Sequence, residues 1–150
     1  MNAEKFELMR KVFEELIPFN RLLGMKVIGG GEGKATLRID FREELVGNFV
    51  TQILHGGVIA SVLDVVGGCA VIASFDPDEP MRGMGTVDLR VDYLRPGKGG
   101  HFLATGQVMR PGKRLASTRM ELHNDEGVLI AIGTAIYRVS TQDRETPINV

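Results

Sequence analysis

Residues 54–74 read LHGGVIASVLDVVGGCAVIAS, a run of apolar and mostly small side chains that contains no proline. From Gly56 to Ser74 this run predicts a long buried helix of about five turns. Its larger apolar side chains fall on one broad helical face, which we expect to pack against a sheet. They are Val58, Ile59, Val62, Leu63 and Val66.

Strands are predicted on both sides of this helix. Residues 26–28 and 34–39 flank a glycine-rich turn, and four segments rich in β-formers follow the helix. Those four segments are residues 85–94, 100–109, 115–123 and 128–139. Alternating polar and apolar side chains indicate strands with one solvated and one buried face. In the first of the four, the face expected to be buried carries Val87, Leu89, Val91 and Tyr93.

A curved antiparallel sheet of about six strands, wrapped around the long helix, is the simplest way to bury that helix. We therefore predict an α+β fold. Apolar residues at helical spacing predict an N-terminal helix within about residues 1–20, ended by Pro18. The polar tail from about 140 to 150 is expected to be loose. Since no repeat or linker interrupts the chain, we expect a single domain over residues 1–150.

Composition excludes several classes of function. The formal charge is −1 and the isoelectric point about 6.3, so we expect no binding to nucleic acid or to an anionic membrane. The single cysteine, Cys69, cannot form an intramolecular disulfide, and no Cys/His set has metal-ligand spacing. The first residues lack the features of a secretory signal, and the apolar central helix carries an aspartate. These features favour a cytoplasmic protein without a membrane span.

Asp64 is the first candidate for chemistry. An aspartate on a surface helix is usually a solvated carboxylate, but here the flanking residues are apolar. Burying a carboxylate is costly unless it is hydrogen-bonded, and such carboxylates recur as catalytic bases. The same side of the helix carries only small residues, which favours close approach of a ligand or of another chain. They are Gly57, Ala60, Ser61, Gly67 and Gly68.

The start of the helix is the second candidate. The first amides of a helix have no internal acceptor and lie at the positive end of its dipole. Gly56 could therefore present a bare N–H to an anionic oxygen, as in an oxyanion hole. An equally good interpretation is that His55 caps the helix and that the glycines form a tight entry.

The spacing of these two candidates predicts an oligomer. Gly56 and Asp64 point in similar directions but lie about 12 Å apart along one helix, so one copy cannot bring both to one carbonyl group. A second helix, antiparallel across a two-fold axis, could bring Asp64 of one subunit beside Gly56 of the other. We therefore expect a homodimer with shared sites.

A wider motif carries a family resemblance. The sequence LHGG at 54–57 with Asp64, followed by TVDL at 86–89 and YLRP at 93–96, resembles the PaaI-type branch of the hotdog thioesterases, close to the YigI-like proteins. The resemblance covers residues from about 23 to 139. It implies a hotdog fold, dimers that often pair into tetramers, and hydrolysis of acyl-CoA or aroyl-CoA thioesters.

The resemblance also implies roles for individual residues. Asp64 matches the acidic residue that serves as general base or nucleophile, and Gly56 matches the glycine whose amide polarises the thioester carbonyl. His55 matches the histidine beside that glycine. Thr86 matches a hydroxyl position that helps to orient the water.

One position departs from the family pattern. The family places an asparagine six residues before the histidine, where this chain has Phe49. A one-residue loop shift would let Asn48 take that role, and Gln52 is the substitute.

Coenzyme A carries phosphates, so a local basic group is expected even in a neutral protein. The run from 110 to 114 supplies one; alone it is typical of a solvated hairpin, but in the family this loop often borders the nucleotide. The candidates for contact with the substrate and its coenzyme A are Gly57, Ser61, Arg95, Arg110, Lys113 and Arg114.

Thioester hydrolysis needs a polarised carbonyl and a carboxylate, so we expect no metal or cofactor, and coenzyme A enters as part of the substrate. The aliphatic helix favours a medium to long fatty acyl chain over a ring. Two alternatives remain open. A hotdog acyl-thioester hydratase or dehydratase would use His55 and Asp64 together, whereas a non-catalytic acyl-CoA sensor could lose Asp64.

Overall fold

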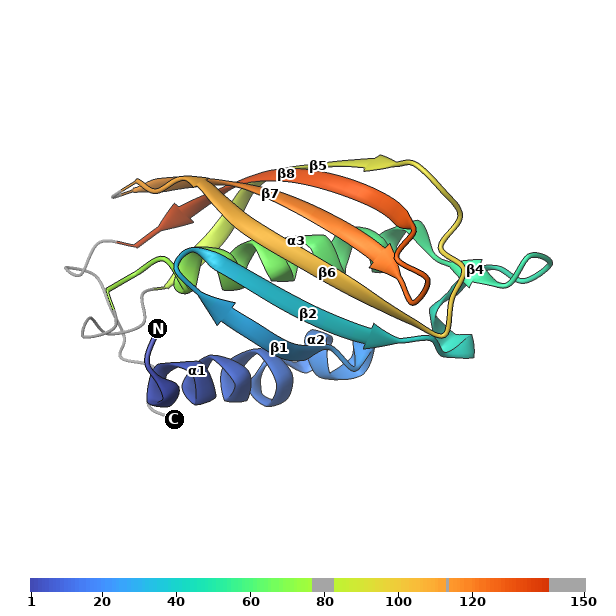
Figure 1. Cartoon of the computed structure of the whole chain (residues 1–150), viewed down its shortest axis with the longest axis horizontal. Coiled ribbons are helices and arrows are strands. Elements are labelled where there is room, and N and C mark those ends of the chain that lie inside the picture. Colours follow the sequence, from blue (N-terminus) through green and yellow to red (C-terminus); the bar gives the residue numbers. More distant parts are fainter. Residues whose placement is uncertain (77–82, 113, 141–150) are drawn as a thin grey trace.

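The chain folds around the long helix that its sequence predicts. In the computed structural model, which describes residues 1–76, 83–112 and 114–140, α3 (Gly56–Ile72) is wrapped by a six-stranded antiparallel sheet (Figure 1). The predicted α+β architecture is confirmed. The sheet has the order β1 (Lys26–Gly31), β2 (Lys34–Asp40), β6 (His101–Arg110), β7 (Leu115–Asn124), β8 (Leu129–Val139) and β5 (Met84–Tyr93).

Local turn chemistry sets two of the hairpins. Glu32 and Gly33 join β1 to β2 with φ angles of 52° and 74°, and two successive positive φ angles fit the twist of a two-residue hairpin. Between β7 and β8, the Asn124 side chain accepts hydrogen bonds from the amides of Glu126 and Val128. These turns fix the register of the strands, and therefore which side chains reach the helix.

The helix lies unusually close to the middle of the sheet. A Cβ atom at Gly106 on β6 would lie 2.7 Å from the carbonyl oxygen of Val66, which is too close for any other residue. The face of α3 that meets the sheet is the predicted one, with Ile59, Val62 and Leu63 buried. The helix axis is therefore held against β6 by backbone contact.

Gly67 and Gly68 pack against side chains of the same chain, whereas close approach of a ligand or of another chain was predicted. Both are buried, because the curved sheet brings β8 and β5 around this side of the helix. A Cβ atom at Gly67 would lie 2.3 Å from the hydroxyl of Tyr137, and one at Gly68 would lie 2.3 Å from the Met84 methyl group. The close neighbours of these glycines are thus side chains of the same chain.

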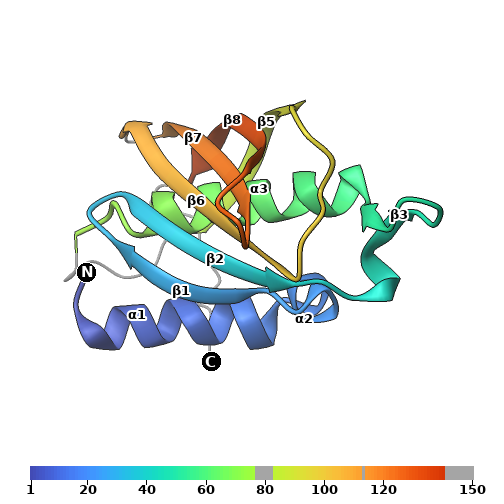
Figure 2. The same cartoon turned by 45° about the vertical axis from the view of Figure 1, so that its right-hand side comes forward.

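The N-terminal segment extends further than predicted. It comprises α1 (Ala3–Arg10), a π-helical segment η1 (Lys11–Leu16) and α2 (Pro18–Leu23), which lie beside β1 (Figure 2). The first helical stretch ends at Leu16, and Ile17 is extended, so the predicted end before Pro18 is confirmed. Pro18 is also the first residue of α2, which was not predicted, and there its fixed φ fits and no amide is needed.

A buried carboxylate fastens this segment to the sheet. Glu14 accepts hydrogen bonds from the Val27 amide at 2.8 Å and from Nζ of Lys26 at 3.1 Å. Burial acts to raise the pKa of Glu14, but these hydrogen bonds outweigh it and hold the pKa below its usual value.

The outer strand β5 departs from the predicted pattern. Val87 and Tyr93 were expected on a buried face, but they are 61% and 53% exposed, and Leu89 and Val91 are only partly buried. The reason is that β5 is at the edge of the sheet and overhangs the helix, with β8 as its one strand partner among the described residues. A bulge at Val87 further interrupts its pairing.

A short hairpin precedes α3. It consists of η2 (Glu43–Leu45), β3 (Val46–Asn48) and β4 (Ile53–Leu54), and it projects beyond the start of the helix (Figure 1). Among the described residues, no helix combines the length and apolarity needed to cross a membrane. The tail expected to be loose lies, from 141 onward, outside the described residues.

Replacement of Gly106 by alanine should lower the free energy of unfolding by about 2 kcal/mol, because the new methyl group would push Val66 and the helix off the sheet. Urea unfolding of Gly106→Ala and of the parent measures the difference. Gly29→Ala is the matched control, since its Cβ would meet Thr36 at an ordinary 3.8 Å. Equal losses in both variants would contradict the close approach.

Candidate active site

Asp64 projects from the middle of α3 into a small network of hydroxyl groups. Its Oδ1 accepts a hydrogen bond from Oγ1 of Thr86 at 2.8 Å. The hydroxyl of Tyr137 lies 2.7 Å from the main-chain oxygen of Asp64 and 3.2 Å from Oδ1. The structure therefore brings together two residues that the sequence singled out and one that it did not.

Tyr137 was missed because nothing in the local pattern of β8 distinguishes it from an ordinary core residue. It is 1% exposed, and a buried phenol needs a hydrogen-bond partner, which was the available signal. Burial, followed by the charge and hydrogen bond of Asp64, raises the pKa of Tyr137 well above its usual value. The hydroxyl therefore stays protonated and acts as a donor.

The Asp64 side chain lines a pocket of about 260 Å³. Four of its ten lining residues come from the N-terminal segment and three from α3, and five of the ten are apolar, so an apolar group can lie beside the carboxylate. The lining residues are Phe13, Ile17, Phe19, Asn20, Ser61, Asp64, Val65, Met84, Thr86 and Tyr137. The Ser61 hydroxyl donates to the Gly57 carbonyl oxygen at 2.7 Å within the helix.

Both interpretations of the helix start are compatible with the structure. Nδ1 of His55 accepts a hydrogen bond from the Gly57 amide at 2.8 Å, so the side chain caps the helix. Nδ1 is then an acceptor, which leaves the proton of the neutral ring on Nε2. The Gly56 amide has no acceptor in the described part of the chain, while the Gly56 carbonyl accepts from the Tyr93 hydroxyl at 2.9 Å. The Gly57 amide is thus hydrogen-bonded to His55, and the Gly56 amide is available to a ligand.

Asn48 and Gln52 lie in the projecting hairpin, away from Asp64 of their own chain. Oδ1 of Asn48 accepts from the amides of Val50 and Thr51, at 3.0 and 3.1 Å. Nε2 of Gln52 donates to the Phe49 carbonyl at 2.8 Å, and its φ angle is 51°. Both side chains therefore hold the hairpin tip, where Phe49 is 84% exposed.

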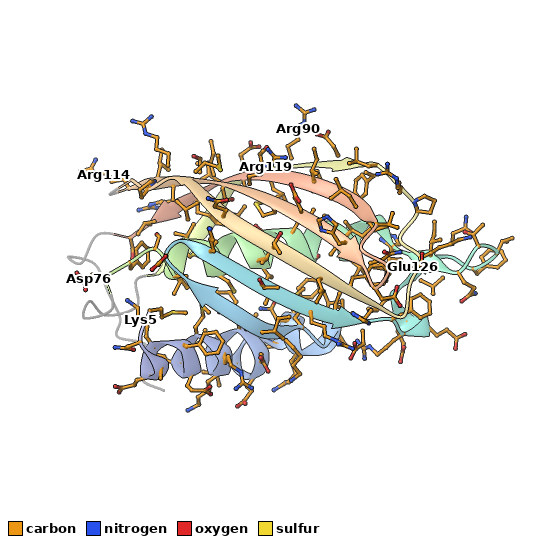
Figure 3. The ribbon with its side chains drawn as sticks, in the orientation of Figure 1. Lys5, Asp76, Arg90, Arg114, Arg119 and Glu126 are labelled. Atoms are coloured by element: carbon orange, nitrogen blue, oxygen red, sulfur yellow. The ribbon has the colours of Figure 1, made fainter. Side chains whose placement is uncertain are left out.

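The basic candidates are spread over the molecule. Arg110 ends β6 and is exposed, and the exposed Arg114 lies at the same end of the sheet (Figure 3). Arg95 follows the other end of β5 and donates to the Leu129 carbonyl oxygen at 3.0 Å. Ten residues of β5 separate the two ends, about 30 Å. One chain therefore cannot use all three for one phosphate group. Lys113 lies outside the described residues.

Within residues 1–76, 83–112 and 114–140, no three side chains of His, Cys, Asp or Glu come close enough to hold a metal ion. Burial raises the pKa of the Cys69 thiol well above its usual value, which keeps this thiol protonated.

Known proteins share both the sequence and the architecture. The family model described as thioesterase superfamily matches residues 51–131. A protein of Escherichia coli strain K12, named medium/long-chain acyl-CoA thioesterase YigI, is 43% identical over 150 residues, covering 93% of this chain and 97% of its own length. The expected resemblance to thioesterases of the YigI-like kind is thereby confirmed.

Solved structures agree on the fold. A Shewanella oneidensis protein described as related to the thioesterase superfamily superposes with a TM-score of 0.83 at 42% identity, covering 93% of this chain and all of that one. The PaaI protein of E. coli, from the phenylacetic acid degradation operon, superposes with a TM-score of 0.79 at 21% identity, covering 93% and 96%. The predicted hotdog fold is confirmed.

Loss of the helix cap should be measurable. His55→Ala leaves the Gly57 amide without its side-chain acceptor and should lower the free energy of unfolding by about 1 kcal/mol in urea titrations. His55→Asn should recover most of this loss, because asparagine is among the best caps. If both variants lost the same stability, the cap would not be the stabilising contact.

Proposed function

Since this chain belongs to the thioesterase superfamily, we propose that it hydrolyses medium- to long-chain acyl-CoA thioesters to the free acid and coenzyme A. The observation that carries this proposal is the Asp64 carboxylate, held by Thr86 at 2.8 Å at the wall of a pocket with largely apolar lining. The name of the E. coli relative gives the same class of acyl chain. Binding of the acyl chain against Phe13, Ile17 and Phe19 would account for that preference.

The reaction needs an anionic group and a donor on opposite sides of the thioester carbonyl. As a general base, Asp64 takes a proton from water while the water oxygen bonds to the carbonyl carbon. The Gly56 amide then stabilises the oxyanion, the C–S bond breaks, and the proton passes to the coenzyme A sulfur. Direct attack by the carboxylate, followed by hydrolysis of the resulting anhydride, uses the same groups. Neither route requires a cofactor or metal.

We propose that the site is completed by a second copy of the chain. Along one helix Gly56 and Asp64 are about 12 Å apart, so the amide and the carboxylate at one carbonyl must come from two helices. Three exposed apolar side chains lie where a two-fold partner would cover them: Val87 and Tyr93 on the edge strand, and Phe49 at the hairpin tip. In such a dimer Asn48 and Gln52 would reach the partner's site and not their own.

The basic residues at the two ends of the sheet fit the same dimer. Arg95 and the Arg110–Arg114 turn are too far apart to share a phosphate within one chain, but two-fold symmetry places ends from different subunits near each site. Lys113 belongs to this proposed coenzyme A site.

A hydratase is the weaker candidate. It would require His55 and Asp64 to act together on neighbouring carbons, but Nδ1 of His55 is engaged by Gly57 and the two residues are more than two helical turns apart. The structure favours a carboxylate acting with an amide donor.

Asp64→Asn should reduce turnover by on the order of a thousandfold, because the amide can neither accept the water proton nor attack. Release of free thiol from acetyl-, hexanoyl-, decanoyl-, palmitoyl- and phenylacetyl-CoA measures the loss and identifies the acyl class. Asp40→Asn removes an exposed carboxylate as the control. If the parent bound acyl-CoA without hydrolysing any of the five, a sensor would replace the enzyme.

Subunit mixing tests the shared site. Gly56→Pro removes the amide proton, and proline fits the first helical position and the extended residue before it. Gly56→Pro and Asp64→Asn homodimers should each be inactive, whereas co-expression should restore about a quarter of the parent activity through the one intact site of each heterodimer. Gly56→Ala, which keeps the amide, is the control. No restoration in heterodimers verified by mass would place both groups in one subunit.

A further inference from the structure

We infer that Tyr137 is a positioning residue of the active site: its hydroxyl and that of Thr86 hold Oδ1 of Asp64, so that Oδ2 is the oxygen that acts on the water or on the thioester. This inference rests on the proposed role of Asp64 in hydrolysis. It adds to that role a residue outside the motifs that identified the site.

The Tyr137 hydroxyl has one proton and two acceptors on the same residue. It lies 2.7 Å from the main-chain oxygen of Asp64 and 3.2 Å from Oδ1. The phenol is 1% exposed, so water cannot substitute for these partners. A charged acceptor makes the stronger hydrogen bond, which favours donation to the carboxylate when Asp64 is ionised.

The helix has a glycine where the phenol approaches it. A Cβ atom at Gly67 would lie 2.3 Å from the Tyr137 hydroxyl oxygen and 3.0 Å from the ring carbon that bears it. Glycine in a helix interior is unfavourable relative to alanine. The close approach of the phenol therefore depends on a locally unfavourable residue, one turn away from Asp64.

Both donors reach the same oxygen of the Asp64 carboxylate. Thr86 donates to Oδ1 at 2.8 Å. Tyr137 reaches the same oxygen from β8, the strand next to β5, because Thr86 and Tyr137 are paired in the β5–β8 register. Among the described residues, no donor lies within hydrogen-bond distance of Oδ2. This oxygen is therefore free to accept a proton or to attack.

The surroundings of Asp64 make Tyr137 the group to test. Of the ten residues that line the pocket, only Asp64 and Tyr137 titrate. Glu14 follows Phe13 in the chain, but its carboxylate accepts hydrogen bonds from Lys26 and from the Val27 amide on β1. Removal of the Tyr137 hydroxyl should leave Oδ1 of Asp64 with Thr86 as its one side-chain donor among the described residues.

A purely structural role predicts a different result. If the hydroxyl only satisfied the main-chain oxygen of Asp64, its loss would leave that oxygen with its helical partner and would not change the NMR signal of the side-chain carboxyl carbon. That signal therefore separates positioning from packing.

Tyr137→Phe is the decisive variant. Its kcat should fall about tenfold with KM nearly unchanged. The carboxyl-carbon NMR signal of Asp64, assigned by its absence in Asp64→Asn, should shift between the parent and the variant at one neutral pH. An unchanged signal and an unchanged kcat would overturn the inference.

Two further measurements test the inference if Tyr137→Phe fails to fold. A ring-fluorinated tyrosine at position 137 is a stronger donor of nearly the same shape, so it should move the Asp64 carboxyl-carbon signal in the direction opposite to that in Tyr137→Phe; no movement would count against the inference. Gly67→Ala should destabilise the parent more than it destabilises Tyr137→Phe, which lacks the clashing oxygen. Equal effects in both backgrounds would contradict the proposed approach.

The NMR signal does not depend on turnover. If the parent hydrolysed no thioester while Tyr137→Phe still shifted the Asp64 signal, the proposed function would fail but the hydrogen bond to the carboxylate would stand. If the parent were active and the signal did not shift, the positioning role alone would fail.

Discussion

Asp64 must keep a polar carboxylate on a helix that is buried along most of its length, and much of the molecule follows from this constraint. A carboxylate beside apolar side chains needs hydrogen-bond donors, and backbone amides of a regular helix cannot supply them. The donors come instead from Thr86 on β5 and Tyr137 on β8, which are neighbours in the sheet. The sheet has to curve around α3 for both to arrive, and Gly67 gives the space for it.

The parts of the fold that depend on local periodicity could be predicted from the sequence. Gly56 begins the central helix as expected, and the strand limits differ from the prediction by a few residues at most. Parts that depend on which element lies opposite could not. A helical wheel places Gly67 beside Asp64, but it does not say that Tyr137, 73 residues away from Asp64, fills the space there. That contact is a product of sheet curvature and register.

The same distinction explains the candidate site. Asp64, Gly56 and Thr86 were found because short motifs carry them, and the structure brings Thr86 to Asp64. Phe13 and Phe19 line the pocket because a π-helical segment and a second helix turn the N-terminal chain back toward α3. Departures from α-helical geometry are poorly encoded by apolar spacing, which is why the π-helical geometry of η1 was not predicted.

A single rigid helix carrying both chemical groups has a consequence for how the chain can work. The distance between Gly56 and Asp64 is fixed by helical rise and cannot be adjusted by motion within one subunit. The Asp64 network, by contrast, is complete within one chain, since Thr86 and Tyr137 belong to the same sheet. In the proposed mechanism, a monomer would hold the carboxylate without the amide donor of a second helix. Assembly through the exposed edge strand, where Val87 and Tyr93 lie at the surface, would in that proposal supply a chemical group as well as stability.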